Sequence, residues 1–233
     1  MSERLLYVAL DHNEQSGNLS LAKQLAEVGG QFGYKINADH YSLWGLPYVK
    51  ELQRHGRPIF VDLKLNNGPR TMTRILAPLA ETGVNHSNVW ALAERLITPT
   101  VEALRQIEGS QLKVLGVTVT SRFDEESCQR HFGRSLDATV KHFTEVALDV
   151  GCDGVILPGT CLDAIRDIET VKLVSGVRPL GLGGDSAQQR EVITPQQAII
   201  NGANILVCGS PIYKSPDPVQ ALRTVLSQIH SLT

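Results

Sequence analysis

The residues Leu5-Leu6-Tyr7-Val8-Ala9-Leu10 form an apolar run that ends abruptly in the polar residues Asp11-His12-Asn13. Such short, nearly continuous apolar runs are typical of strands in parallel sheets, because both faces of those strands are buried. An open, doubly wound sheet usually carries a G-x-G-x-x-G turn directly after its first strand, and none follows here. The stretch therefore favours a closed barrel over an open dinucleotide-binding sheet.

Seven further short runs with the same character follow along the chain. With the first, the eight predicted strands are Leu5–Leu10, Gly33–Ala38, Ile59–Leu63, Asn85–Trp90, Leu112–Val119, Gly154–Leu157, Val171–Ser175 and Ile205–Cys208. Apolar residues recur at helical spacing between the runs, as in Leu21, Leu25 and Val28. Eight strand–helix units predict an α/β fold of the (β/α)₈ TIM-barrel type, with residues 1–233 as a single domain.

The composition of the chain limits the kinds of binding partner and the cellular compartment that we expect. The net charge is −2, and Lys and Arg are spread along the chain, so neither nucleic acid nor a membrane surface is an expected partner. The first apolar run is too short for a signal peptide or a membrane span, so we expect a cytoplasmic protein. The four cysteines form no C-x-x-C pair and the seven histidines no ligand spacing, so we expect neither a disulfide framework nor a metal site.

Polar residues at the ends of the predicted strands are the candidates for chemistry, because barrel enzymes place reactive side chains there. Asp11 closes the first run, Lys35 lies in the second, and Asp62 and Lys64 end the third. Asp62 and Lys64 are two residues apart and therefore share a face of the strand. With Lys35 they predict an alternating charge network in the barrel mouth; a purely structural salt bridge is the alternative.

A second candidate region extends from Val177 to Pro218. It is rich in glycine, and both the helix opened by Thr194-Pro195 and the turn at Gly209 could present backbone N–H groups to a phosphate. A mobile loop without a binding role is the alternative for this region.

Taken together, these segments resemble the orotidine 5′-phosphate decarboxylase family over nearly the whole chain. The resemblance is carried by Val8-Ala9-Leu10-Asp11, Lys35, Asp62-x-Lys64, Pro69 with Thr71, Val117-Thr118-Val119-Thr120-Ser121, Gly151-x-Asp153-Gly154-Val155, Gly176-Val177-Arg178-Pro179, Gln189, Thr194-Pro195, Gly202-Ala203 and Gly209-x-Pro211-Ile212. It implies a (β/α)₈ barrel that needs neither cofactor nor metal and works as a homodimer.

The resemblance also implies a role for individual residues. Lys64 would protonate the carbanion left at C6 of the pyrimidine, and Lys35 and Asp62 would hold it in place and set the local field. The remaining matches are to ligand contacts: Asp11 and Thr71 to the ribose, Thr71 from the opposite subunit, Ser121 to the pyrimidine, and Gln189 to the phosphate.

Several residues depart from the family pattern. Asn67 stands where the motif Asp-x-Lys-x-x-Asp ends in a second aspartate, which reaches the neighbouring subunit's site. Ser210 replaces an arginine that binds phosphate, and Trp90 replaces a histidine at the end of the fourth strand. Decarboxylation of orotidine 5′-phosphate to UMP remains the leading hypothesis. The alternatives are a reaction on another nucleotide or a sugar phosphate, and a nucleotide-binding protein without turnover.

Overall fold

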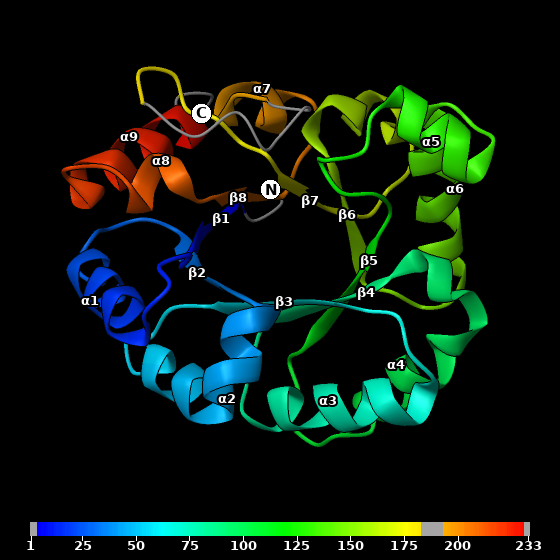
Figure 1. Ribbon diagram of the computed structural model, residues 1–233, viewed down its shortest axis with the longest axis horizontal. Coiled ribbons are helices and arrows are strands. Elements are labelled where there is room, and N and C mark those ends of the chain that lie inside the picture. Colours follow the sequence, from blue (N-terminus) through cyan, green and yellow to red (C-terminus); the bar gives the residue numbers. More distant parts are fainter. Residues whose placement is uncertain (1–3, 183–192, 231–233) are drawn as a thin grey trace.

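The computed structural model describes residues 4–182 and 193–230 of the chain, and in them eight strands form a closed barrel in the order β1 to β8. Each strand pairs in parallel with the next, and β8 pairs with β1 to close the ring (Figure 1). Helices lie outside the ring and connect successive strands. The predicted TIM-barrel class is thereby confirmed.

The strands begin and end close to the predicted residues. They are β1 (Leu5–Ala9), β2 (Phe32–Asn37), β3 (Ile59–Leu65), β4 (His86–Trp90), β5 (Lys113–Val117), β6 (Gly154–Pro158), β7 (Val171–Ser175) and β8 (Ile205–Cys208). The largest differences are in β3, which continues two residues beyond Leu63, and in β5, which stops at Val117. The residues after Val117 remain buried as far as Val119, which is why their apolar pattern resembled a longer strand.

The described helices alternate with the strands. The α-helices are α1 (Gln15–Leu25), α2 (Ala38–Gln53), α3 (Pro69–Glu81), α4 (Thr98–Arg105), α5 (Glu125–Phe132), α6 (Leu136–Asp149), α7 (Pro195–Ile200), α8 (Ser210–Tyr213) and α9 (Pro218–His230), and the 3₁₀ helices are η1 (Ala91–Leu96) and η2 (Gly159–Ile165). Pro69 and Pro195 both occupy the first helical turn, where a missing N–H costs nothing, as the sequence predicts. No described helix is long and apolar enough to cross a membrane.

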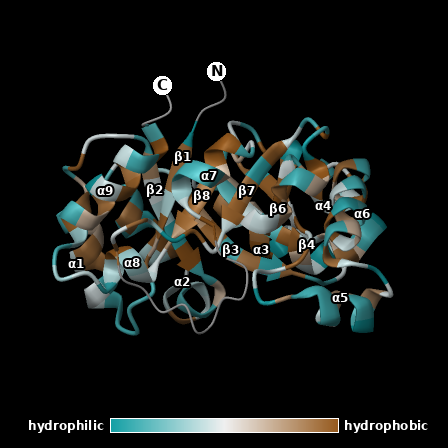
Figure 2. Cartoon of the chain, turned by 90° about the horizontal axis from the view of Figure 1, so that it is seen from above, coloured by the Kyte–Doolittle hydropathy of each residue, from teal (hydrophilic) through white to brown (hydrophobic). Residues whose placement is uncertain are grey.

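Apolar side chains form two cores. The larger lies between the strands and the surrounding helices, and the smaller fills the inside of the barrel. Figure 2 shows both colours on the surrounding helices, with the hydrophilic colour dominating α5. The four cysteines are all buried, as expected for small apolar residues.

The inner core follows the two-residue period of the strands. Tyr7 and Ala9 of β1, Leu115 and Val117 of β5, and Ile205 and Val207 of β8 all face the barrel interior. Glycine is required at position 33 of β2, since a Cβ atom there would lie 2.2 Å from the Pro58 carbonyl oxygen and 2.8 Å from the Tyr7 ring. This packing closes the amino-terminal end of the barrel and leaves the carboxyl-terminal end open for a site.

Candidate functional site

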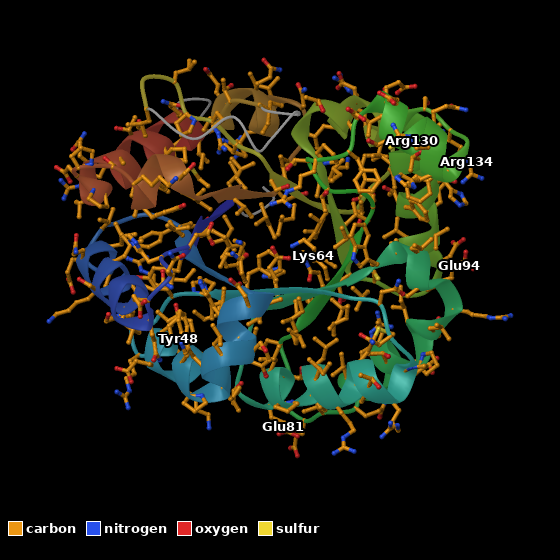
Figure 3. All side chains as sticks on the ribbon, in the orientation of Figure 1. Tyr48, Lys64, Glu81, Glu94, Arg130 and Arg134 are labelled. Atoms are coloured by element: carbon orange, nitrogen blue, oxygen red, sulfur yellow. The ribbon has the colours of Figure 1, made fainter. Side chains whose placement is uncertain are left out.

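A cavity of about 540 Å³ opens at the carboxyl-terminal ends of the strands. The described residues lining it are Ala9, Asp11, Lys35, Asn37, Phe60, Asp62, Lys64, Val117, Val119, Thr120, Ser121, Arg122, Ile156, Leu173, Ser175, Gly176, Arg178, Val207, Gly209, Ser210, Tyr213 and Lys214. In Figure 3 the labelled Lys64 lies toward the centre of the ring of strands, whereas Glu81, at the end of α3, lies at the outer edge of the molecule. The position matches that of the active sites of other TIM barrels.

The strand period explains why the lining changes from apolar to polar toward the mouth. Inward-facing Ala9 is followed two residues later by Asp11, and inward-facing Phe60 is followed by Asp62 and then Lys64. The same face of β2 carries Lys35 and Asn37. On β1 and β3, an apolar residue of the barrel floor is thus followed by polar residues of the cavity, and β2 adds two further polar side chains.

The structure brings four predicted site residues into one chain of opposite charges. The Lys35 ammonium nitrogen lies 3.7 Å from an oxygen of Asp11 and 3.7 Å from an oxygen of Asp62. Lys64 Nζ lies 2.5 Å from the other Asp62 oxygen. Lys35 is almost fully buried, whereas Lys64 reaches the solvent-accessible cavity with 36% of its side chain exposed.

Asp62 carries its charge despite being buried. Burial by itself raises the pKa of a carboxyl group, but the two neighbouring lysines and the hydrogen bonds from Lys64 and Asn88 outweigh that effect. The pKa of Asp62 therefore lies below its ordinary value. The Asp62 carboxylate thus places a negative charge directly beside the Lys64 ammonium group.

The backbone at Lys64 is in the left-handed region, with φ of 50°. The pairing of β3 with β4 is irregular at this point, where the register shifts between Val61 and Leu65. Asn88 of β4 stabilises the irregularity, because its side-chain oxygen accepts hydrogen bonds from the backbone N–H groups of Leu63 and Lys64 at 2.9 and 2.6 Å. Its amide nitrogen donates to Asp62 at 2.7 Å, so one buried side chain holds both the carboxylate and the lysine backbone.

Asn37 is a lining residue that the sequence analysis did not identify. Its amide nitrogen donates to Asp11 at 2.7 Å, and its oxygen accepts a hydrogen bond from Lys35. The available signal was its position two residues after Lys35, which places it on the same face of β2.

Basic residues at the cavity mouth are a second group, to which the sequence analysis assigned no role. Arg122 follows β5, Arg178 follows β7, and Lys214 follows α8. Together with Lys35 and Lys64 they give the described lining five basic side chains against the two carboxylates of Asp11 and Asp62. This excess of positive charge suits an anionic ligand.

The other predicted residues fall into three groups. Ser121, Gly209 and Ser210 line the cavity. Asn67, exposed after β3, and Thr71, in the first turn of α3, do not line the cavity of their own chain. Gln189 lies outside the described residues.

Trp90 ends β4 half-buried, where it packs against the inner barrel core. Within residues 4–182 and 193–230, no group of three or more His, Cys, Asp or Glu side chains is arranged to hold a metal ion.

Comparisons with known proteins agree with this architecture. A model of the orotidine 5′-phosphate decarboxylase / HUMPS family matches residues 4–225. The orotidine 5′-phosphate decarboxylase of Nautilia profundicola is 32% identical over 231 residues, which cover 97% of this chain and 99% of the relative. That of Nitrosococcus oceani is 29% identical over 236 residues, with 100% of both chains covered. The crystal structure of the Lactobacillus acidophilus enzyme is similar with a TM-score of 0.77 at 24% identity, covering 98% of this chain and 100% of that one.

Proposed function

The chain belongs to the orotidine 5′-phosphate decarboxylase / HUMPS family, and we propose that it converts orotidine 5′-phosphate to UMP and CO₂ without a cofactor. The observation that carries this proposal is the charge chain Asp11–Lys35–Asp62–Lys64 in the wall of the cavity. The curated relatives at about 30% identity are named as orotidine 5′-phosphate decarboxylases, which supports the same activity. The corresponding place in metabolism is cytoplasmic pyrimidine biosynthesis.

The proposed reaction needs one proton and no electron transfer. The bond between C6 and the carboxylate breaks, its electron pair stays on C6, and CO₂ leaves. Lys64 then gives a proton to C6 and regains one from water, so that the product is UMP. The buried negative charge of Asp62 disfavours a substrate carboxylate placed beside it, and this repulsion is relieved as CO₂ forms.

The phosphate end of the substrate would lie toward the basic rim. Ser210 offers one neutral hydrogen bond there, where the family pattern has an arginine. Arg178 and Lys214 line the same cavity as Gly209 and Ser210 and add positive charge to it. We therefore expect phosphate binding to be retained but weaker than with a bidentate arginine.

We further propose a homodimer in which Asn67 and Thr71 complete the cavity of the partner subunit. Both residues lie outside the cavity of their own chain, and Asn67 is exposed. Sharing of sites across a two-fold axis requires a closed pair of subunits. Sedimentation in the presence of UMP checks this, and a monomer at micromolar protein concentration contradicts it.

The activity is tested by incubating the purified protein with orotidine 5′-phosphate and following both the loss of substrate absorbance and the appearance of UMP. Lys64→Ala should abolish turnover. Lys113→Ala is the matched control, because Lys113 pairs with Asp153 at the start of β5, on the opposite end of the barrel, and should leave turnover unchanged.

Each alternative predicts a different result in the same assay. Binding of UMP by the wild-type protein without any release of UMP from saturating substrate supports a nucleotide-binding protein. Turnover of a sugar phosphate only with an added divalent metal supports another activity within the family. Either result refutes the decarboxylase proposal.

A further inference from the structure

Asn37 occupies the N-cap position of α2, where an asparagine side chain normally accepts a hydrogen bond from the first helical turn. It makes no such bond here, although its backbone is in the extended conformation that capping requires. The side chain instead lies in the cavity wall between Asp11 and Lys35. A capping residue whose side chain is directed into a charged site suggests a role in that site.

The charges around Asn37 fix the orientation of its amide group. The oxygen must face the Lys35 ammonium and the nitrogen must face the Asp11 carboxylate, because the reverse arrangement would set like partial charges against each other. The amide therefore bridges the Asp11 carboxylate and the Lys35 ammonium group. Both carboxylates stand 3.7 Å from Lys35 Nζ, beyond hydrogen-bonding distance, whereas Asn37 is directly bonded to it.

This geometry matters because the Lys35 ammonium group is shared between the carboxylates of Asp11 and Asp62. Without a further bond, the almost fully buried ammonium group of Lys35 would move toward one of its two carboxylates, and closer pairing with Asp11 would withdraw it from Asp62. Bonding to Asn37 holds the ammonium between them. The same amide donates to Asp11 at 2.7 Å and so fixes the carboxylate that would meet the sugar hydroxyls of the ligand.

We propose that Asn37 is a positioning residue that sets the places of Asp11 and Lys35, and through Asp11 determines how strongly the site distinguishes the hydroxyl groups of a ribose. This inference rests on the proposed function, since it assumes a nucleotide in the cavity. Asn37 acts through Asp11 and Lys35, and no chemical step is assigned to it.

Two substitutions at position 37 separate the positioning role from a capping role. Asn37→Ala removes both bonds, and Asn37→Ser places a good capping residue at the start of α2 but is too short to bridge Asp11 and Lys35. If Asn37 positions the site, both variants should lower kcat/KM for orotidine 5′-phosphate about ten- to a hundred-fold, the range expected when a hydrogen bond to a charged group is lost. Loss of the two bonds should lower the Tm of Asn37→Ala by a few degrees, and Asn37→Ser should show the same loss of kcat/KM even where a new helix cap raises its Tm.

The ligand test compares UMP with 2′,3′-dideoxyuridine 5′-phosphate, which lacks both sugar hydroxyls. The wild-type protein should prefer UMP, and Asn37→Ala should lose most of that preference while its affinity for the dideoxy compound changes little. Asn85→Ala is the matched control, since the Asn85 side chain accepts the Ile59 N–H at 2.9 Å outside the cavity. That variant should lose stability and keep the preference.

Three results would overturn the inference. The first is an unchanged preference for UMP in both position-37 variants. The second is a loss of Tm in Asn37→Ala that Asn37→Ser restores together with activity, which is the behaviour of a helix cap. The third is a wild-type protein that neither binds UMP nor turns over substrate; this result removes the proposed function as well and is recognised before any variant is made. If Asn37→Ala does not fold, Asn37→Ser carries the same comparison.

Discussion

Replacement of Asn88 by alanine should destabilise the barrel and disable its site together. The Asn88 side chain is fully buried and makes three hydrogen bonds, two from backbone N–H groups and one to Asp62. Each buried partner left without a bond costs about 1–3 kcal/mol. Water from the cavity can reach the Asp62 and Lys64 side chains, so we take the low end and expect about 3–4 kcal/mol in total.

For a domain of this size, 1 kcal/mol corresponds to about 2–4 °C, so the Tm of Asn88→Ala should fall by roughly 6–15 °C. The neighbouring variant Ser87→Ala is the matched control. Ser87 is equally buried and donates one hydrogen bond to the Val61 carbonyl at 2.8 Å, so its loss should cost only about 1 kcal/mol.

The turnover of Asn88→Ala should fall as well. Without Asn88, nothing among the described side chains holds the left-handed backbone of Lys64, and Asp62 loses one of the hydrogen bonds that lower its pKa. In the proposed reaction, kcat should then fall much more than KM rises. The reasoning fails if the Tm of Asn88→Ala falls no further than that of Ser87→Ala, as measured by thermal unfolding of both.

Three shorter predictions concern the pH dependence of stability and two of the departures from the family pattern, Ser210 and Asn67. Burial lowers the pKa of His86 to about 4, so the unfolded chain binds more protons than the folded protein between about pH 6.5 and 4. The free energy of unfolding should therefore fall as the pH drops through that window, by at most about 3 kcal/mol. Urea unfolding at several pH values should show a shallower fall for His86→Gln, and an equal dependence on pH in both proteins refutes this prediction. Ser210→Arg should tighten UMP binding about ten-fold or more by adding a charged hydrogen bond; calorimetry that finds unchanged affinity places the phosphate elsewhere. Asn67→Asp should raise the decarboxylation rate, even with weaker substrate binding, because a carboxylate near that of the substrate destabilises the ground state; an unchanged kcat contradicts this.

Much of the fold was predictable because buried parallel strands leave a simple pattern. The runs around Val171–Ser175 and Ile205–Cys208 were predicted with the observed bounds, since polar or glycine residues end both of them. The shared face of Asp62 and Lys64 followed from the two-residue period alone. That period did not reveal the left-handed backbone at Lys64, which depends on a side chain of the neighbouring strand.

The site residues that the sequence analysis did not identify were overlooked for a common physical reason. Asn37 and Asn88 are uncharged, so they do not stand out as chemical groups, and their importance comes from the charged partners that the fold places beside them. Arg122 and Lys214 are exposed in sequence segments that resemble ordinary loops. Only the closure of the barrel shows that they border the same cavity as Lys64.

Two of the departures from the family pattern, Asn67 and Ser210, lie outside the buried charge network. Neither Asn67 nor Ser210 forms part of the Asp11–Lys35–Asp62–Lys64 chain, and Asn67 lies outside the cavity of its own subunit. In the proposed complex, the carboxylate missing at position 67 would act at the reacting end of the ligand, and the guanidinium missing at position 210 would act at the phosphate end. Groups at opposite ends of a ligand share no partner, so their effects on free energy should add. The double variant Asn67→Asp with Ser210→Arg should therefore show the kcat gain of the first and the affinity gain of the second, multiplied in kcat/KM. A combined effect far from that product would mean that the two positions are coupled through the network, and that the buried charges respond to changes at the rim.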